Sequence, residues 1–282
     1  MTARSPHSGH RRSQNRTPLI AAVAAGVLSL AIAAQAALAT DRPQAGGTAA
    51  GVRVLAGPQA AGEVQLTATR RVTGVFDGGR TRFTAAGAPA GDGQEEGQDP
   101  LFELADGAVL KNVVLGAPAA DGVHCLGGCT LENVFWEDVG EDAATFLGES
   151  ADARYVVNGG GAARAADKVF QFNGAGTLTV RNFEVADFGK LVRSCGNCSK
   201  QFRRDVVLEN VTATAPGGEL VGINGNFGDT ARLSGITVLG DPDREIVPCQ
   251  KFRGVTGGEP EKLDATADGV NCVFGQADIR FG

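Results

Sequence analysis

The chain has 282 residues, a formal net charge of −6 and an aromatic content of 6%. Its first 39 residues hold four of the 26 Lys and Arg and none of the 32 Asp and Glu, so the remainder has 22 basic and 32 acidic residues, a net charge of −10. Proteins bind nucleic acid through basic surfaces, so this charge argues against a nucleic-acid partner.

Residues 1–39 have the pattern of an export signal. A basic, acid-free start precedes an apolar run over residues 19–34 and a small-residue cleavage site at residues 37–39 (Ala-Leu-Ala). A transmembrane anchor is the alternative, but the Ala-rich run is shorter than the ~20 strongly apolar residues that a span needs. The pair Arg11 and Arg12 resembles a twin-arginine signal, yet the expected hydrophobic residue does not follow it. We predict a general secretory signal and an extracellular protein with no membrane attachment after cleavage.

The 243 residues after the signal (282 − 39) are enough for one large all-β domain or two small ones. Residues 40–63 are rich in Ala, Gly and Pro and have no periodicity. We therefore predict a disordered linker over residues 40–63 and a folded domain over residues 64–282.

All six cysteines follow the export signal, and disulfides form readily outside the cell. Six cysteines allow fifteen pairings. Two of the pairs are nearly adjacent in sequence, so we favour Cys125–Cys129 and Cys195–Cys198, with Cys249–Cys272 as the third pair. A zinc site at residues 195–198 needs two further sulfur or imidazole ligands, and His124 is the only histidine after the signal. A redox role is another alternative, but no thioredoxin-like strand–helix pattern surrounds these residues.

From residue 64 onward the chain repeats a short motif with Asn in a fixed place. Residues 110–114 read Leu-Lys-Asn-Val-Val, and residues 131–135 read Leu-Glu-Asn-Val-Phe. Further copies begin at residues 155, 180, 208 and 233, so successive starts lie 21, 24, 25, 28 and 25 residues apart. Periods of this length indicate a solenoid.

The repeated segments are short, rich in β-branched residues and bounded by Gly, Asn and Asp. We predict a single-domain, all-β fold: a right-handed parallel β-helix with coils of roughly 20–28 residues that stack Leu, Val, Ile and Phe inside. The Asn residues can form a ladder of side-chain amides at one corner. A β-sandwich also has alternating strands, but its hairpins would not repeat one motif with Asn in a fixed place.

Charged residues recur at nearly the same interval. Steps of 25, 21, 25 and 26 residues connect Glu96, Asp121, Asp142, Asp167 and Arg193, and Lys168 follows Asp167. Residues one coil apart lie over one another, so we predict a stripe of acids that ends in a lysine and an arginine. Adjacent residues on a strand point to opposite faces, so Glu141 with Asp142, and Asp167 with Lys168, can share a site only at a bend.

Stacked acids in such a stripe lie at the spacing of neighbouring strands, ~4.8 Å. Two unit charges at that distance repel by roughly 3.5 kcal/mol at an effective dielectric of about 20. The acids tolerate this if they point into water, become protonated or share a cation. Calcium is a hard ion that binds several carboxylate oxygens, so the stripe favours a calcium site.

A longer signature surrounds these charged residues. Residues 129–146 read CTLENVFWEDVGEDAATF, residues 159–162 GGGA and residues 166–169 ADKV. Residues 189–198 read GKLVRSCGNC, residues 222–231 GINGNFGDTA and residues 249–250 CQ. In this order, over residues 64–282, the runs resemble the class III pectate lyases, polysaccharide lyase family 3. The resemblance implies a small parallel β-helix, in agreement with the repeats.

The resemblance also implies calcium-dependent β-elimination on polygalacturonate, with Ca²⁺ as the cofactor. Four acids match calcium ligands of the family: Asp121, Glu141, Asp142 and Asp167. The lysine that matches Lys168 is the base, and the arginine that matches Arg193 lies beside the reacting uronate. Glu96 and Lys190 match substrate-binding positions. Calcium neutralises the substrate carboxylate, and a guanidinium can bind it through two parallel hydrogen bonds.

Two positions depart from the family pattern and concern the substrate subsites. Phe172 stands where many members have His, and Val192 stands where an aromatic residue is common. We expect polygalacturonate or pectin as the substrate and a monomeric protein.

Two other functions fit a β-helix. A pectin hydrolase would use paired carboxylates without a metal, and it would not need Lys168 and Arg193 on the stripe. A non-catalytic wall-binding protein would display aromatic side chains along one face. Trp136 and Tyr155 are the only Trp and Tyr of the chain, which argues against that function.

Overall fold

The computed structural model describes Leu55 and residues 57–91, 97–119 and 121–282. The expected export signal, most of the expected linker and Glu96 lie outside these described residues. Within them, no helix is long and apolar enough to cross a membrane. The helical segments in the same ranges are two short 3₁₀ turns, η1 (Gly225–Phe227) and η2 (Gln276–Asp278).

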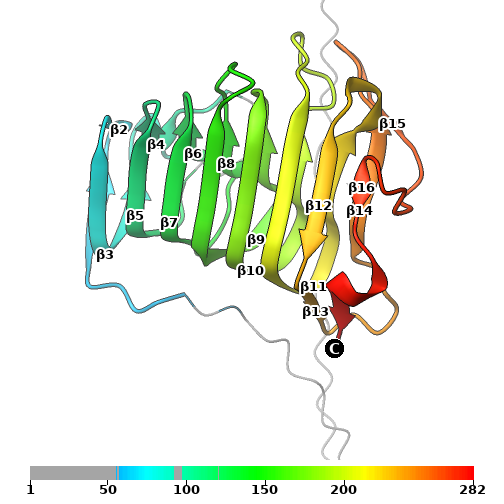
Figure 1. Cartoon of the computed structure of the whole chain (residues 1–282). Coiled ribbons are helices and arrows are strands. Elements are labelled where there is room, and N and C mark those ends of the chain that lie inside the picture. Colours follow the sequence, from blue (N-terminus) through cyan, green and yellow to red (C-terminus); the bar gives the residue numbers. More distant parts are fainter. Residues whose placement is uncertain (1–54, 56, 92–96, 120) are drawn as a thin grey trace, which may run out of the picture. The chain divides into compact units, whose positions relative to one another are not determined.

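Strands dominate the described residues and join into one 17-stranded sheet that winds in successive coils. Figure 1 shows the coils side by side, from blue at the first coil to red at the last. The strands are β1 (Gly62–Leu66), β2 (Arg70–Val72), β3 (Val75–Ala85), β4 (Pro100–Leu104), β5 (Ala108–Leu115), β6 (Asp121–Cys125), β7 (Cys129–Trp136), β8 (Asp142–Phe146), β9 (Arg154–Phe172), β10 (Gly176–Ser194), β11 (Arg204–Asn224), β12 (Thr230–Ser234), β13 (Ile236–Leu239), β14 (Val247–Arg253), β15 (Glu261–Lys262), β16 (Cys272–Val273) and β17 (Ile279–Phe281).

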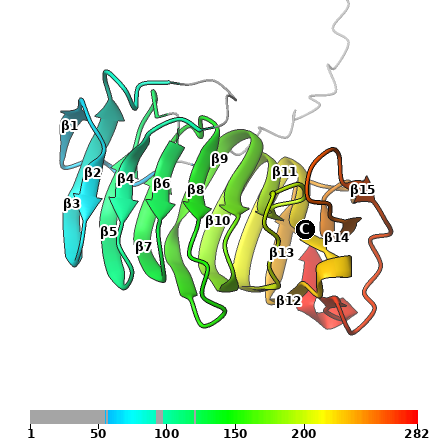
Figure 2. The ribbon, with the colours of Figure 1, turned by 90° about the horizontal axis from the view of Figure 1, so that it is seen from above.

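The strands stack in parallel because each pairs with the strands one coil before and one coil after it. One stack runs through β2, β4, β6, β8, the last residues of β9, β10 and β11, and then β14. We call this stack the site face, and β2, β4, β6 and β8 follow one another along it in Figure 2. Among the described pairings, that of β14 with β15 alone is antiparallel. The predicted parallel β-helix is confirmed.

The repeated motif supplies the interior of the coils. Side chains that are at most 3% exposed occupy equivalent places in six coils: Leu110, Leu131, Val157, Val180, Leu208 and Leu233. Burying each such side chain contributes about 1.5–3 kcal/mol. The third copy of the motif is displaced from its expected place, because Val157 rather than Tyr155 stacks on Leu131. That coil is two residues longer than the motif spacing suggested.

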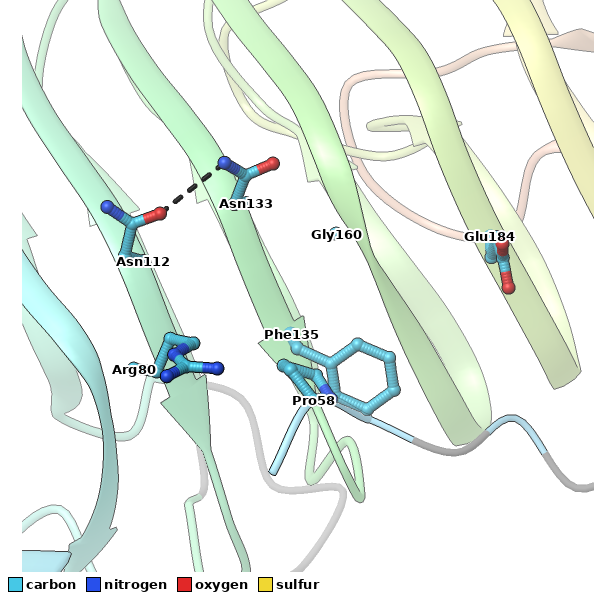
Figure 3. A pocket seen from close by; sticks show the side chains of 7 residues that line it. All are labelled: Pro58, Arg80, Asn112, Asn133, Phe135, Gly160 and Glu184. Carbon is cyan, nitrogen blue, oxygen red and sulfur yellow. Dashed lines mark hydrogen bonds between the residues drawn. The ribbon is translucent and has the colours of Figure 1, made fainter. Parts of the chain in front are cut away.

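The recurrent Asn residues occupy a sharp turn of each coil. Four of them have φ values between 52° and 54°: Asn112, Asn133, Asn182 and Asn210. This left-handed conformation suits Asn and Gly, and Gly159 and Gly235 adopt it in the coils that lack Asn there. Asn133 Nδ2 donates to Asn112 Oδ1 at 3.4 Å, drawn as a dashed line in Figure 3. Asn182 Nδ2 donates to Asn158 Oδ1 at 2.9 Å, so among the described residues the predicted amide ladder is present as two separate pairs.

A cavity of about 390 Å³ lies beside this turn, between β7 and the segment before β1. Figure 3 shows Pro58 against the ring of Phe135. Gly57 approaches the same ring so closely that an added Cβ would lie 2.5 Å from it. This segment therefore packs on the coils, and β1 begins at Gly62, two residues before the expected domain boundary.

Three disulfides join the cysteines as predicted: Cys125–Cys129, Cys195–Cys198 and Cys249–Cys272. The first two close short loops. The third links β14 to β16, which pairs with β12, so it ties the C-terminal segment to the last coils. The end of the solenoid is thus held covalently.

We predict that Cys249→Ala/Cys272→Ala lowers the melting temperature more than Cys125→Ala/Cys129→Ala. Loop closure gives the 23-residue separation a stabilisation of about 3 kcal/mol and the four-residue separation about 2 kcal/mol. Circular dichroism melts of both double variants and the parent check the order. Equal melting temperatures for the two variants would contradict the reasoning.

We predict that Asn210→Val destabilises the fold by about 1–2 kcal/mol, because a β-branched residue fits poorly at its φ of 54°. Asn210 is exposed, so little packing changes with it. Asn210→Gly is the matched control, since Gly accepts the same backbone conformation, and its loss should be smaller. Urea unfolding of the three proteins measures the difference; equal losses for both substitutions would be against this explanation.

Candidate active site

Charged side chains form a row along the site face, where its strands begin. Strand pairing stacks, in order, Asp121, Asp142, Lys168, Lys190 and Glu219. Neighbouring coils lie ~4.8 Å apart. The row therefore reads acid, acid, lysine, lysine, acid along the solenoid.

Three carboxylates gather at the start of β6 and β8. Asp121, Glu141 and Asp142 are 3%, 4% and 3% exposed, and ligand oxygens from the three lie within 4.8 Å of one another. Glu141 joins Asp142 because the chain bends at Gly140 and Glu141, as the sequence required. Buried carboxylates this close repel one another and lose hydration, so the cluster needs positive neighbours.

The donors around the cluster leave one oxygen of Asp121 unsatisfied among the described residues. Asp121 Oδ2 lies 3.1 Å from His124 Nε2, and Asp142 Oδ2 accepts a hydrogen bond from Thr145 Oγ1 at 3.3 Å. Asp121 Oδ1 is buried and has no hydrogen-bond partner among the described residues. A buried acceptor without a donor is costly, and several carboxylate oxygens are the ligands that Ca²⁺ prefers. The residues of the cluster fit a hard divalent cation.

Lys168 places an amine beside the cluster. Its Nζ donates to Glu141 Oε1 at 3.2 Å and to Asp167 Oδ2 at 3.0 Å, and it lies 3.8 Å from Asp142 Oδ1. Burial lowers the pKa of Lys168, but the carboxylates of Asp142, Asp167 and Glu141 outweigh burial and hold this pKa above its usual value. Lys168 is therefore an ammonium group at neutral pH while these carboxylates are charged.

Asp167 bridges two lysines. Its Oδ2 accepts a hydrogen bond from Lys168 Nζ at 3.0 Å, and its Oδ1 accepts one from Lys190 Nζ at 2.7 Å. Partial burial raises the pKa of Asp167, but Lys190 and Lys168 outweigh it and hold this pKa below its usual value. The structure thus brings three of the four expected calcium ligands into one cluster and sets Asp167 between the two amines.

Arg193 lies in a neighbouring row of the site face. It pairs with Gln171 on one side and Gly222 on the other, while Lys190 stacks on Lys168. The expected stacking of Arg193 on Lys168 is wrong by three residues, because this coil is short: Lys168 and Lys190 are 22 residues apart (190 − 168). The order along the solenoid holds, since the coil of Lys168 lies between those of Asp142 and Arg193.

The Arg193 guanidinium is buried and held by later coils. Its Nη1 donates to Asn224 Oδ1 at 3.1 Å, and its Cζ lies 3.9 Å from the centre of the Phe252 ring. Burial lowers the pKa of Arg193 to about 10, against the carboxylates of Glu219 and Asp229, which raise it. The group keeps its positive charge at neutral pH.

The two departures from the family pattern lie in the interior. Phe172 and Val192 are 0% exposed, and the Phe172 ring lies 5.4 Å from that of Tyr155. Neither side chain reaches the surface of the site face. These two positions therefore affect the packing beneath the site face and not its surface.

Sequence reasoning missed the acid that ends the row. Glu219 is 7% exposed, and its Oε1 accepts a hydrogen bond from Lys262 Nζ at 2.8 Å. Glu219 follows Lys190 by 29 residues (219 − 190), which is longer than the interval used to find the others. Lys262 comes from the antiparallel strand β15, which breaks the repeat. No periodic signal pointed to this pair.

A family model described as pectate lyase matches residues 55–259 of the chain. The chain belongs to the pectate lyase family. This match spans the coils from before β1 to beyond β14 and includes the charged row from Asp121 to Glu219. The buried carboxylates and the amine beside them therefore lie within the part that defines this pectate lyase domain.

Curated pectate lyases from fungi are similar over most of their length. The chain is 47% identical over 191 residues to a probable pectate lyase F of Aspergillus terreus, which covers 67% of this chain and 79% of that protein. It is 41% identical over 220 residues to pectate lyase E of Emericella nidulans, which covers 78% of this chain and 84% of that protein.

Solved structures of bacterial pectate lyases share the fold. The catalytic domain of pectate lyase PelI from Erwinia chrysanthemi matches with a TM-score of 0.66 and 32% identity, over 78% of this chain and 99% of that chain. PelI in complex with tetragalacturonic acid matches with a TM-score of 0.64 and 32% identity, over 77% of this chain and 70% of that chain.

Proposed function

We propose that this pectate lyase domain is a secreted, calcium-dependent enzyme of class III, polysaccharide lyase family 3, which cleaves polygalacturonate by β-elimination. The observation that carries the proposal is the buried cluster of Asp121, Glu141 and Asp142, with Lys168 Nζ 3.2 Å from Glu141 Oε1. The complex of PelI with tetragalacturonic acid supports an oligogalacturonate as the ligand.

The three clustered carboxylates would hold the calcium ion, and Asp167 would join them by releasing one of its lysines. When bound, calcium supplies a positive charge that neutralises the substrate carboxylate and lowers the energy of the carbanion-like state next to it. Asp121 Oδ1 supports this assignment, because it is buried and lacks a hydrogen-bond partner among the described residues.

Lys168 would act as the base. β-Elimination moves the C5 proton to the base, forms a C4–C5 double bond and breaks the bond between C4 and the glycosidic oxygen, which takes up a proton from water. Nζ of Lys168 can take the C5 proton only as a neutral amine. In the protein without a bound cation, the surrounding carboxylates raise the pKa of Lys168, so the neutral amine is scarce at neutral pH. Calcium on those carboxylates and the nearby Arg193 would lower this pKa, and alkaline conditions would favour turnover further.

Arg193 and Lys190 would bind uronate carboxylates on the coils that follow. Arg193 presents a planar guanidinium suited to two parallel hydrogen bonds, and Lys190 presents a point charge. Glu96 remains a candidate substrate contact. A polyanion that lies along the solenoid axis would then meet first the acids with their shared cation and next the cationic groups of Lys190 and Arg193.

Export to the outside of the cell fits the three disulfides, which persist in oxidising surroundings. Residues 1–39 would supply the secretory signal, and the enzyme would act as a monomer after their removal. Incubation with polygalacturonate tests the reaction class directly. Products with ultraviolet-absorbing unsaturated ends are expected, whereas saturated reducing ends would identify a hydrolase instead.

We predict that Asp121→Asn and Asp142→Asn lower calcium affinity by about tenfold or more and reduce activity at limiting calcium, because each removes a charged ligand. Calorimetric titration with Ca²⁺ and lyase assays over a calcium series measure the two effects. Full activity of the parent in excess chelator would refute the metal assignment.

Asp138→Asn is the matched control for these variants. Asp138 lies in the same stretch of chain, but its carboxylate is 43% exposed and pairs with Arg164 at 3.0 Å. Calcium affinity and turnover should stay at the parental level, and the β-rich circular dichroism spectrum should persist in all three variants.

We predict that Lys168→Ala leaves calcium binding and substrate affinity nearly intact and lowers turnover by a factor of about 10² or more, as for loss of a general base. The parent's turnover should rise with pH through the alkaline range, since deprotonation of Lys168 creates the base. Turnover with saturating calcium across that range is the measurement.

Lys190→Ala and Arg193→Ala are the comparison variants, because both remove a positive charge near Lys168. They should raise KM for polygalacturonate and keep the alkaline rise in turnover. If Lys168→Ala turns over normally while one of the other two loses the reaction, the base is the residue changed in that variant.

A further inference from the structure

The Arg193 side chain crosses from its own coil onto the next one. Gly222 pairs with Arg193 in that coil, and a Cβ added to Gly222 would lie 2.8 Å from Arg193 Cδ. Any side chain at position 222 would therefore collide with the arginine. Because Gly222 has no side chain, Arg193 can pass over it and contact two residues of the later coils, Asn224 and Phe252.

Asn224 holds one edge of the guanidinium. Its Oδ1 accepts a hydrogen bond from Arg193 Nη1 at 3.1 Å, and its Nδ2 donates to the carbonyl of Cys195 at 2.8 Å. The second bond fixes which end of the amide faces the arginine. The backbone N–H of Asn224 donates to Asp229 Oδ2 at 2.9 Å. Asn224 and Asp229 are 0% exposed, so this support is buried.

Phe252 holds the flat face of the same guanidinium. Its ring centre lies 3.9 Å from Arg193 Cζ, within the range of a cation–π contact. Phe252 pairs with Asn224 in neighbouring strands, so both supports come from the end of the solenoid where β11 and β14 lie side by side (Figure 2). A face contact and an edge contact together define the plane of a guanidinium.

The other edge of Arg193 passes beside Gly196, where an added Cβ would lie 2.5 Å from Nη2, and it forms no hydrogen bond to the described residues. All of its hydrogen bonds to the described residues use Nη1, whose acceptors are Ser194 O, Gly222 O and Asn224 Oδ1. Nε and Nη2 form none to these residues. These two nitrogens present parallel N–H groups, the geometry that binds a carboxylate with two hydrogen bonds.

We propose that Asn224 and Phe252 are positioning residues for Arg193, which orient its Nε–Nη2 edge toward a uronate carboxylate of the substrate. This inference rests on the proposed function, in which Arg193 binds substrate. It gives a role to the run at residues 222–229, which contributes the space at Gly222, the amide of Asn224 and the carboxylate of Asp229. None of these three residues would touch the substrate.

A double-mutant cycle tests the proposal, because a residue that acts through Arg193 has no effect once Arg193 is gone. The proteins are the full chain with Phe252→Leu, Arg193→Ala and both changes, assayed on polygalacturonate with saturating calcium. We expect Phe252→Leu to lower kcat/KM by about tenfold, mainly through KM, as for loss of a well-packed cation–π contact. The double variant should match Arg193→Ala alone.

Phe281→Leu is the matched control. Phe281 also lies at the C-terminal end of the solenoid, and its ring centre is 4.7 Å from Arg244 Cζ. The same change to the same kind of contact, away from Arg193, should leave kcat/KM at the parental level. Asn224→Ala serves as the second probe if Phe252→Leu fails to fold, and it should show the same dependence on Arg193.

Three results would overturn the positioning role: parental or higher kcat/KM for Phe252→Leu, an equal loss for Phe281→Leu, or effects of Phe252→Leu and Arg193→Ala that multiply in the double variant. Failure of the proposed function looks different. In that case the parent releases no unsaturated products, or Arg193→Ala keeps the parental kcat/KM, and no residue can then act through Arg193.

Discussion

The close stacking of carboxylates is the constraint on which the site depends. Backbone hydrogen bonds between coils set the spacing of Asp121 and Asp142, so these side chains cannot move apart without opening the sheet. Both are almost fully buried, as is Glu141. Water cannot screen their repulsion, and the cluster is stable only with positive charge beside it. Lys168 supplies part of that charge, and a bound cation would supply the rest.

The parallel β-helix turns this constraint into an ordered surface. Each coil contributes one position to the row, so the row reads acid, acid, lysine, lysine, acid from Asp121 to Glu219. A linear polyanion lying along the axis would meet these groups in sequence. Arg193 adds a second row and depends on the last coils for its orientation. The Cys249–Cys272 disulfide, which ties the end segment to those coils, therefore supports the site from a distance.

Local patterns in the sequence predicted the fold well. The repeated motif marked the turns, four of which hold Asn, because few other residues accept a left-handed φ. Two cysteine pairs followed from their short separations, and the third pair joins the two cysteines that remain. The acids and Lys168 could be placed on one face because their spacing matches the coil length. Family resemblance then assigned chemistry to residues that spacing alone only grouped.

Register was harder to predict, because loops between strands change the length of each coil. The coil from Lys168 to Lys190 is shorter than its neighbours, which moved Arg193 out of the expected row. The direction of a side chain could not be predicted from the sequence either. Arg193 passes over Gly222, and only the folded structure shows that this glycine lies beside it in the next coil. A crystal structure grown with Ca²⁺ tests the central claim most directly. We expect an anomalous peak about 2.3–2.6 Å from oxygens of Asp121, Glu141 and Asp142, whereas an ion bound elsewhere with this cluster still hydrogen-bonded only to protein would contradict it.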